Sequence, residues 1–154
     1  MELTEQVSST LGKTTTKFHS FTFDRVFSPE SSQKDCFEEI SQLVQSALDG
    51  FNVCIFAYGQ TGSGKTFTMQ GPSMPTEETS GMIPRAVQQI YEVVQQLKQF
   101  GWEYRMEGQF LEIYNETIND LLGNSSNYGK IKHEIHHEKN GKTSVTDMTS
   151  GTYS

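Results

Sequence analysis

The chain has 154 residues, of which 12 are basic and 19 acidic, giving a net charge of −7. This length suits one domain, and the acidic balance argues against nucleic-acid binding. Two cysteines imply no disulfide framework, and the sequence shows neither a signal peptide nor an apolar run of membrane-spanning length. We therefore predict one domain over residues 1–154, with neither nucleic acid nor membrane as a partner.

The N-terminal part of the chain is predicted to hold one strand and one helix. Residues 1–17 are rich in Ser and Thr, and we interpret them as poorly ordered loop or, at most, short edge strands. Alternating phenylalanines predict a strand over residues 21–27. A Ser-x-x-Asp capping box that starts at Ser32 predicts a helix, which the apolar spacing carries to Leu48 and which Gly50 stops.

The middle of the chain predicts a buried strand, a surface loop and a second long helix. Residues 52–58 form a short apolar, β-branched and aromatic run that is typical of a buried strand. Residues 71–81 contain two prolines and no apolar periodicity, which indicates a surface loop. Pro84 then lies in the first turn of a helix that ends at Gly101.

The C-terminal part is predicted to be β-structure. Residues 104–114 read as one strand and residues 125–130 as loop. Residues 131–148 are predicted to form a hairpin, with Asn140-Gly141 as its two-residue type I′ turn.

Residues 59–66 match the complete phosphate-loop pattern G-x-x-x-x-G-K-[ST] between a predicted strand and a helix start. Its glycines let successive backbone N–H groups curl inward around an anion, and the helix N-terminus behind the loop adds partial positive charge. Lys65 is predicted to reach the β- and γ-phosphates, and the Thr66 hydroxyl to hold Mg²⁺. The pattern therefore predicts binding of a magnesium nucleotide, and a chance Gly-rich turn is the alternative.

Five segments resemble the kinesin motor domain family, in that family's order. The loop segment IFAYGQTGSGKTFTM over residues 55–69 is the most specific of them. The segments GWEY (101–104), HEI (133–135) and TSVT (143–146) lean toward kinesins with C-terminal motors, the minus-end-directed group of the yeast karyogamy motor. The resemblance covers residues 18–148, and its other segments are FTFDRVF (21–27), GMIPR (81–85), FLEIYNE (110–116) and DLL (120–122).

The resemblance implies an α/β P-loop NTPase fold, with an incomplete central sheet flanked by helices. It implies a motor that hydrolyses Mg·ATP to move along microtubules, in the cytoplasm and on the cytoskeleton, spindle microtubules included. It also implies dimerisation through a coiled coil outside this chain. Kinesins place a ring against adenine where Phe67 stands, and packing under the helix is the alternative for this ring. The implied nucleotide-binding residues are Gly59, Gln60, Thr61, Gly62, Ser63, Gly64, Lys65, Thr66 and Phe67.

Several family motifs do not occur in these residues. The sequence has no N-x-x-S-S-R, no D-x-A-G-x-E and no R-x-R-P, so the catalytic residues stay unassigned. The D-x-x-G at Asp120 stands where kinesins have no switch, and we interpret it as a decoy. We expect the N-terminal half of a motor, clipped at both ends and inactive alone, with residues 53–57 exposing an unpaired edge that favours aggregation. The alternatives are a non-hydrolytic kinesin-homology interaction protein and an inactive truncated gene product.

Two further patterns lie in the predicted hairpin. Residues 133–137 match the zinc-protease signature H-E-x-x-H, but that chemistry needs a helix, and a hairpin strand is the favoured interpretation. His133 and His137 would share a strand face, which leaves adventitious metal binding open. The lysines of this stretch form either a solvated turn or a secondary microtubule contact, and they are Lys130, Lys132, Lys139 and Lys142.

Overall fold

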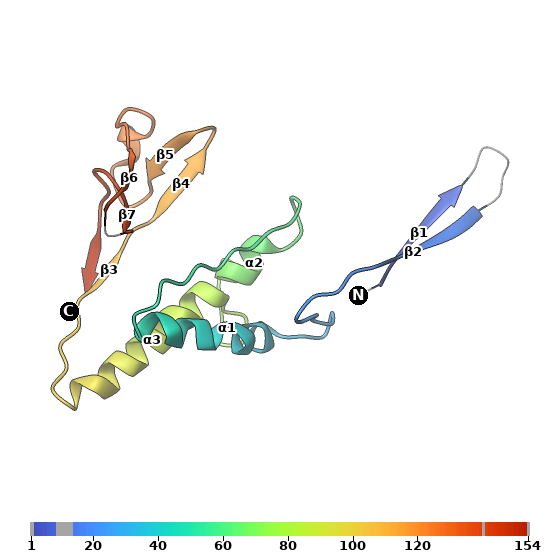
Figure 1. Cartoon of the computed structure of the whole chain (residues 1–154), viewed down its shortest axis with the longest axis horizontal. Helices are drawn as coiled ribbons and strands as arrows, with labels where there is room; N and C mark the ends of the chain where they lie inside the picture. The colour runs from blue at the N-terminus through green and yellow to red at the C-terminus, as the bar shows by residue number, and fades with distance from the viewer. Residues whose placement is uncertain (1, 9–13, 140, 154) are drawn as a thin grey trace. The chain divides into compact units, whose positions relative to one another are not determined.

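The computed structural model describes residues 2–8, 14–139 and 141–153. The chain divides into two compact units, Met1–Gln95 and Gln96–Ser154, and each is described here by itself (Figure 1). Within the described residues, no helix is long and apolar enough to cross a membrane.

The first unit begins with an antiparallel strand pair. Strand β1 (Glu2–Ser8) pairs with β2 (Thr14–Ser20), from Glu2 opposite Ser20 to Ser8 opposite Thr14. The sequence suggested loop or, at most, short edge strands here, and so underestimated the length of the strands. Threonines favour the extended conformation. The degree of order predicted for residues 1–17 stays a prediction.

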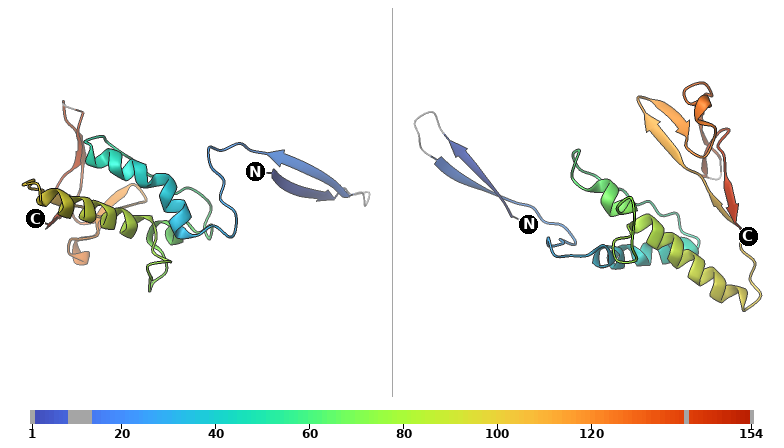
Figure 2. Two further views of the ribbon diagram at one scale, coloured as in Figure 1. Left: turned by 90° about the horizontal axis from the view of Figure 1, so that it is seen from below. Right: turned by 180° about the vertical axis from the view of Figure 1, so that it is seen from behind.

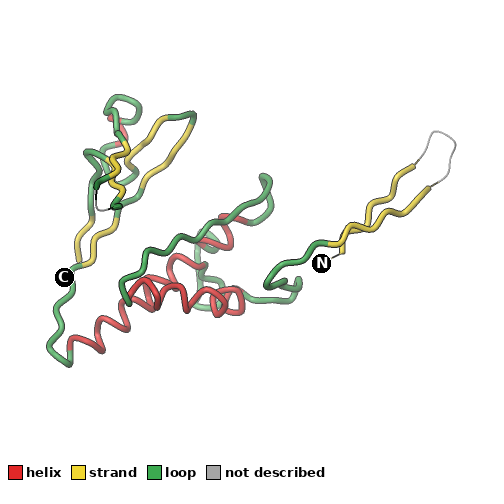
Figure 3. The backbone as a smooth tube through the Cα atoms, in the orientation of Figure 1, coloured by secondary structure: helices red, strands yellow, loops and turns green. Residues whose placement is uncertain are grey.

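Two segments predicted as strands are not strands. Residues 21–27 and residues 52–58 are irregular, and Figure 3 draws both as loop. Phe56 is 88% and Tyr58 101% exposed, so the second segment is not the buried strand that its composition predicted. Apolar residues become a strand only when a neighbouring strand supplies hydrogen-bond partners. Neither segment pairs with a described strand. The unpaired, aggregation-prone edge expected over residues 53–57 stays a prediction.

Helix α1 (Gln33–Leu48) has the predicted boundaries. At its start, the Asp35 N–H donates to Ser32 Oγ at 3.1 Å and the Ser32 N–H donates to Asp35 Oδ2 at 2.7 Å, which completes the capping box. At its end, the Gly50 N–H donates to the Ala47 carbonyl at 3.1 Å, and the Phe51 N–H donates to the Ser46 carbonyl at 3.0 Å. This Schellman arrangement needs the left-handed φ of +97° at Gly50.

Two more helices complete the first unit. Helix α2 (Lys65–Gln70) follows the glycine-rich loop, and α3 (Met82–Lys98) follows the predicted surface loop, with Pro84 in its first turn. Val44 of α1 and Val94 of α3 are the buried apolar residues among those described. The Gln89 side chain of α3 donates to the Ser41 carbonyl of α1 at 3.1 Å. The three helices lie together in every view (Figure 2).

The second unit is built from short antiparallel pairs. The predicted single strand over residues 104–114 is wrong, because the chain breaks between two strands that pair with different partners. Strand β3 (Met106–Gly108) pairs with β8 (Gly151–Tyr153), whereas β4 (Leu111–Tyr114) pairs with β5 (Thr117–Asp120). The β4–β5 turn has positive φ at Asn115 (48°) and Glu116 (61°), which matches the twist of a two-residue hairpin.

The predicted hairpin near the C-terminus forms, with a different turn. Strand β6 (Ile135–His137) pairs with β7 (Thr143–Val145), and Ile135 lies opposite Val145. The Glu138 N–H donates to the Lys142 carbonyl at 2.7 Å, and the Gly141 N–H donates back to the Glu138 carbonyl at 3.0 Å. This register places three residues in the loop, so the two-residue type I′ turn at Asn140-Gly141 is wrong. Gly141, at φ +84°, takes the left-handed position of a longer turn, and Asn140 lies outside the described residues.

Strand pairing among the described residues amounts to four two-stranded antiparallel sheets. Both cysteines are free thiols: Cys36 is partly buried on α1, and Cys54 is exposed in the irregular segment rather than in a buried strand. Burial raises the pKa of the Cys36 thiol, with a smaller effect from the neighbouring Asp35 carboxylate.

Candidate functional site

The phosphate-loop pattern folds into a tight turn that leads directly into α2. The Ser63 N–H donates to the Gln60 carbonyl at 3.2 Å. Gly62 and Gly64 have φ of +80° and +89°, a backbone region that side-chain-bearing residues rarely adopt. Gly64 is the N-cap of α2, and its carbonyl accepts the Thr68 N–H at 2.8 Å. The motif glycines are therefore required by the turn itself.

Lys65 folds back over the loop that precedes it. Its ammonium donates to the Gly59 carbonyl at 2.9 Å and to the Gln60 carbonyl at 2.8 Å. A Cβ on Gly59 would lie 2.5 Å from Ser63 Oγ, so a side chain there would clash across the turn. The Lys65 ammonium, the one positive charge in the motif, thus links the end of the loop to its beginning.

The donor set of this loop fits a magnesium nucleotide. Residues 59–64 carry backbone N–H groups on a curled chain, of which that of Ser63 is donated to the Gln60 carbonyl, and Lys65 adds an ammonium that can exchange carbonyl oxygens for phosphate oxygens. The Thr66 side chain is exposed in the first turn of α2 and offers the hydroxyl that Mg²⁺ sites of this kind use. The residues predicted from the sequence to bind phosphate and metal are therefore brought together.

Phe67 lies on α2, one residue after the magnesium candidate. Its side chain is 51% exposed, which disfavours simple packing under the helix and leaves ring surface accessible to a planar base. Its carbonyl accepts two hydrogen bonds, from the Gly71 N–H at 2.8 Å and from the Gln33 side-chain amide at 2.6 Å. Sequence reasoning missed Gln33, because a glutamine at the start of a helix carries no pattern that points to a partner 34 residues away.

The loop between α2 and α3 is fastened at its base. The Gly81 N–H donates to the Gln70 carbonyl at 3.4 Å, where the two ends of the loop meet. Arg85 of α3 donates from Nε to the Ser80 carbonyl at 2.9 Å and from Nη2 to the Glu77 carbonyl at 2.6 Å. Beside this loop lies an open hollow of about 610 Å³, lined by Phe37, Glu77, Ser80, Pro84, Arg85, Gln88, Gln89 and Glu92.

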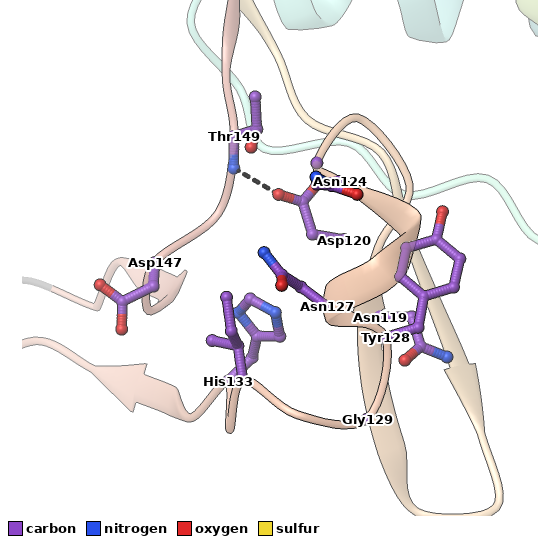
Figure 4. Close-up of a pocket in the computed structure, with 11 residues that line it drawn as sticks. Asn119, Asp120, Asn124, Asn127, Tyr128, Gly129, His133, Asp147 and Thr149 are labelled. Atoms are coloured by element: carbon purple, nitrogen blue, oxygen red, sulfur yellow. Dashed lines mark hydrogen bonds between the residues drawn. The ribbon is translucent and has the colours of Figure 1, made fainter.

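The D-x-x-G at Asp120 has a structural role in the second unit. Asp120 is buried at the end of β5, where its carboxylate accepts the Leu122 N–H at 3.0 Å and the Thr149 N–H at 2.8 Å (Figure 4). Hydrogen bonding from Thr149, through side chain and backbone, lowers the pKa of Asp120, and the Leu122 and Gly123 amides add to this. The hollow beside it measures about 100 Å³ and is lined mainly by polar side chains, including Asn119, Asn127, His133 and Asp147.

The H-E-x-x-H pattern lies on the β6–β7 hairpin and not on a helix. The His133 ring donates from Nδ1 to the Thr146 carbonyl at 2.9 Å, and His137 Nδ1 lies 3.0 Å from Thr143 Oγ1. Among the described residues no cluster of three or more His, Cys, Asp or Glu could hold a metal ion. The preference for a hairpin strand over a zinc protease is confirmed, because the strand does not give the pattern its helical spacing.

The same hairpin carries lysines at its base and at its turn. Lys132 lies 2.7 Å from Glu134, and this contact raises the pKa of Lys132 and lowers that of Glu134. Lys139 lies in the turn and Lys142 directly after it, and both are exposed. Exposed lysine side chains are therefore present at both ends of the hairpin.

The geometry of residues 59–67 defines the class of protein first. A left-handed glycine turn that closes on its own lysine and leads into a helix beginning Lys-Thr is a phosphate loop of the P-loop nucleotide-binding type. The model of the kinesin motor domain matches residues 1–154, and the chain belongs to this family. The resemblance drawn from the sequence motifs is confirmed.

Similarity to individual proteins indicates which group of kinesins the chain resembles. The chain is 56% identical over 143 residues to kinesin-like protein klpA of Emericella nidulans, covering 92% of this chain and 18% of the relative. It is 59% identical over 117 residues to carboxy-terminal kinesin 2 of Xenopus laevis, covering 76% of this chain and 18% of the relative. The expected lean toward C-terminal kinesins is confirmed by these similarities.

A solved structure supports the fold class. The motor domain of the Saccharomyces cerevisiae kinesin-like protein Kar3 superposes with a TM-score of 0.76 at 39% identity, over 99% of this chain and 47% of that chain. The fold is thus the α/β P-loop NTPase fold of kinesin motors, represented in part. The chain spans about a fifth of the curated relatives it matches and about half of this solved motor domain.

Proposed function

We propose that this chain supplies the nucleotide-binding part of a microtubule motor that hydrolyses Mg·ATP. The observation that carries the proposal is the phosphate loop, in which Lys65 and Thr66 stand at the first turn of α2 behind a left-handed glycine turn. Kinesin motors bind nucleotide and are microtubule-stimulated ATPases as a family, and membership of that family supports the same activity for the parent protein.

The proposed division of labour follows from the donors. Backbone N–H groups of residues 59–64 would bind phosphate oxygens, and Lys65 would give up its two carbonyl contacts to reach the β- and γ-phosphates. The Thr66 hydroxyl would hold Mg²⁺, and the exposed Phe67 ring would stack on adenine. Bound Mg·ATP supplies a phosphoryl group for transfer to water. The groups that position this water are not among the residues assigned here.

The proposed partner of the hairpin is the microtubule. Tubulin surfaces are acidic, and Lys139 in the β6–β7 turn and Lys142 directly after it are exposed. A dimer through a coiled coil and a location on cytoplasmic and spindle microtubules are further parts of this proposal, which rest on membership of the kinesin family alone.

The test compares Lys65→Ala with the wild type in the full-length protein. Removing the ammonium takes away a charged contact to the transferring phosphoryl group, and we expect microtubule-stimulated turnover to fall about 100-fold or more. Lys98→Ala, which removes a lysine from the last turn of α3, is the matched control. Turnover of Lys65→Ala within about twofold of the wild type would refute the proposal, since one contact to a charged group contributes about 1.5–3 kcal/mol.

A second outcome of the same experiment would distinguish a motor from a non-hydrolytic interaction protein. A full-length protein that binds nucleotide and microtubules but shows no turnover, with or without Lys65, is a non-hydrolytic interaction protein with a kinesin fold. The absence of N-x-x-S-S-R and D-x-A-G-x-E from residues 1–154 is what keeps this candidate in view.

A further inference from the structure

One buried polar side chain of the first unit is not used by the phosphate loop. Gln33 is the first residue of α1, and it is 9% exposed. Its side-chain amide donates at 2.6 Å to the carbonyl of Phe67, 34 residues further along the chain. Burying an amide is unfavourable unless it is hydrogen-bonded, so this contact fixes where the Gln33 side chain lies.

The α1 end of this contact is held rigidly. The capping box between Ser32 and Asp35 fixes the backbone immediately around Gln33. Its hydrogen bonds, mainly the Ser32 N–H, lower the pKa of Asp35 and so favour the charged carboxylate that accepts them. The amide therefore projects from a fixed point toward α2.

The α2 end is held from outside at two backbone carbonyls: that of Gln70, which accepts the Gly81 N–H at 3.4 Å, and that of Phe67, which accepts the Gln33 amide. Helix α2 has six residues, and none of them is buried. Isolated helices of this length are unstable in water, so external contacts decide where the helix lies. Lys65 and the turn before it are held by bonds within the loop, at 2.8 and 2.9 Å, whereas the Phe67 carbonyl is held from outside by Gln33.

We propose that Gln33 is a positioning residue that sets the place of the Phe67 ring, and thereby the affinity for the base of the nucleotide rather than for its phosphates. This inference rests on the proposed nucleotide binding. The phosphate donors keep their own local bonds when Gln33 is replaced, but the ring loses the contact that orients the helix turn carrying it. The loss therefore falls on the adenine.

The experiment measures the affinity of the full-length protein for Mg·ATP and for magnesium tripolyphosphate, which has the phosphates and no base. The variants are Gln33→Met, which keeps the length and removes the donor, and Gln33→Glu. Glutamate at this position suits the helix N-terminus, so Gln33→Glu breaks the contact without weakening α1. Gln42→Met, an exposed glutamine of the same helix, is the matched control.

We expect both Gln33 variants to bind ATP about 3- to 10-fold more weakly, the loss of one neutral hydrogen bond. Tripolyphosphate affinity and the Gln42→Met variant should stay within about twofold of the wild type. In a Phe67→Ala background, Gln33→Met should cause no further loss of ATP affinity, because the ring through which it acts is gone.

Two results would overturn the inference. One is an unchanged ratio of ATP to tripolyphosphate affinity in both variants, whether both affinities stay the same or fall equally, which would assign Gln33 a purely structural role. The other is a full additional loss of ATP affinity when Gln33→Met is made in the Phe67→Ala background. A wild-type protein that binds neither ligand defeats the proposed function itself, whereas a wild type that binds both while the variants match it defeats this inference alone.

Discussion

The phosphate loop and the β6–β7 hairpin are held by different means. In the loop, the stabilising contacts join residues five and six apart: Lys65 reaches the carbonyls of Gly59 and Gln60. In the hairpin the contacts join distant residues, as where the Thr146 N–H donates to the Glu134 carbonyl at 3.0 Å. The Thr149 N–H likewise reaches back to Asp120 at 2.8 Å.

This difference teaches what each region needs to keep its shape. The shape of the phosphate loop is set locally, by the φ values of its glycines and by the contacts of one lysine. The loop keeps this geometry although residues 52–58 before it form no strand. The hairpin depends on partners across the ladder. Changes within the loop should therefore alter chemistry, whereas changes around the hairpin should alter stability and surface charge.

The largest effect should come from Thr66, which tests the chemical half of this comparison. Thr66→Ala removes the proposed magnesium ligand, and we expect turnover to fall about 100-fold or more, with a higher magnesium requirement. Thr66→Ser keeps the hydroxyl and should recover most of the activity. Magnesium titrations of the ATPase provide the measurement. Equal loss in both variants would show that the methyl group, and not the hydroxyl, is what matters.

Next in size is the base of the loop between α2 and α3. A Cβ on Gly81 would lie 2.6 Å from backbone atoms of Gln70 and Gly71, which cannot move aside as a side chain can. We expect Gly81→Ala to lower the free energy of unfolding by about 1–3 kcal/mol, measured by denaturant titration. Gly108→Ala, where a Cβ would meet nothing within 4 Å, is the control. Equal stability of the two variants would contradict the close approach.

The third prediction concerns how the stability of the second unit depends on pH. Because the folded-state pKa of Asp120 is lowered, its stabilising contribution is complete above the unfolded pKa of about 3.9 and is lost as the pH falls through the folded value. Asp120→Asn should therefore be less stable than the wild type at neutral pH, and the gap should narrow below about pH 4. Thermal unfolding across a pH series measures it, with the exposed Asp24→Asn as control. A gap that is constant with pH would exclude the charge as its cause.

The smallest effect is expected at the hairpin turn. Exposed charge pairs contribute about 0–1 kcal/mol each. Lys139→Ala with Lys142→Ala should therefore weaken microtubule binding several-fold at low salt, and less as the ionic strength rises. Co-sedimentation over a salt series would decide, and identical curves for the double variant and the wild type would make this a solvated turn without a partner.

Features set by neighbouring residues could be predicted from the sequence. The cap at Ser32, the stop at Gly50 and the phosphate loop all rest on interactions within one turn, and all were found where expected. The strands predicted over residues 21–27 and 52–58 failed because residue type alone does not supply a ladder partner. The hairpin turn was missed by one residue for the same reason, since its register is fixed by Ile135 opposite Val145 rather than by the turn dipeptide.

Some residues of the candidate site could not be predicted from the sequence either. The loop residues from Gly59 to Thr66 were identified by a spacing pattern that mirrors their chemistry. Gln33 and Arg85 were not, because each acts on backbone carbonyls, which every residue has. A side chain that recognises the main chain leaves no partner type in the sequence to search for.

The closed base of the loop between α2 and α3 has a consequence for engineering. The Gly81 N–H donates to the Gln70 carbonyl, so the two ends of the loop meet and its length does not set the distance between α2 and α3. Each doubling of such a loop costs only about 0.6 kcal/mol in closure entropy. An epitope or a fluorescent-dye tag inserted beside the exposed Met74 should therefore be carried without displacing either helix, which would place a reporter within the nucleotide-binding unit.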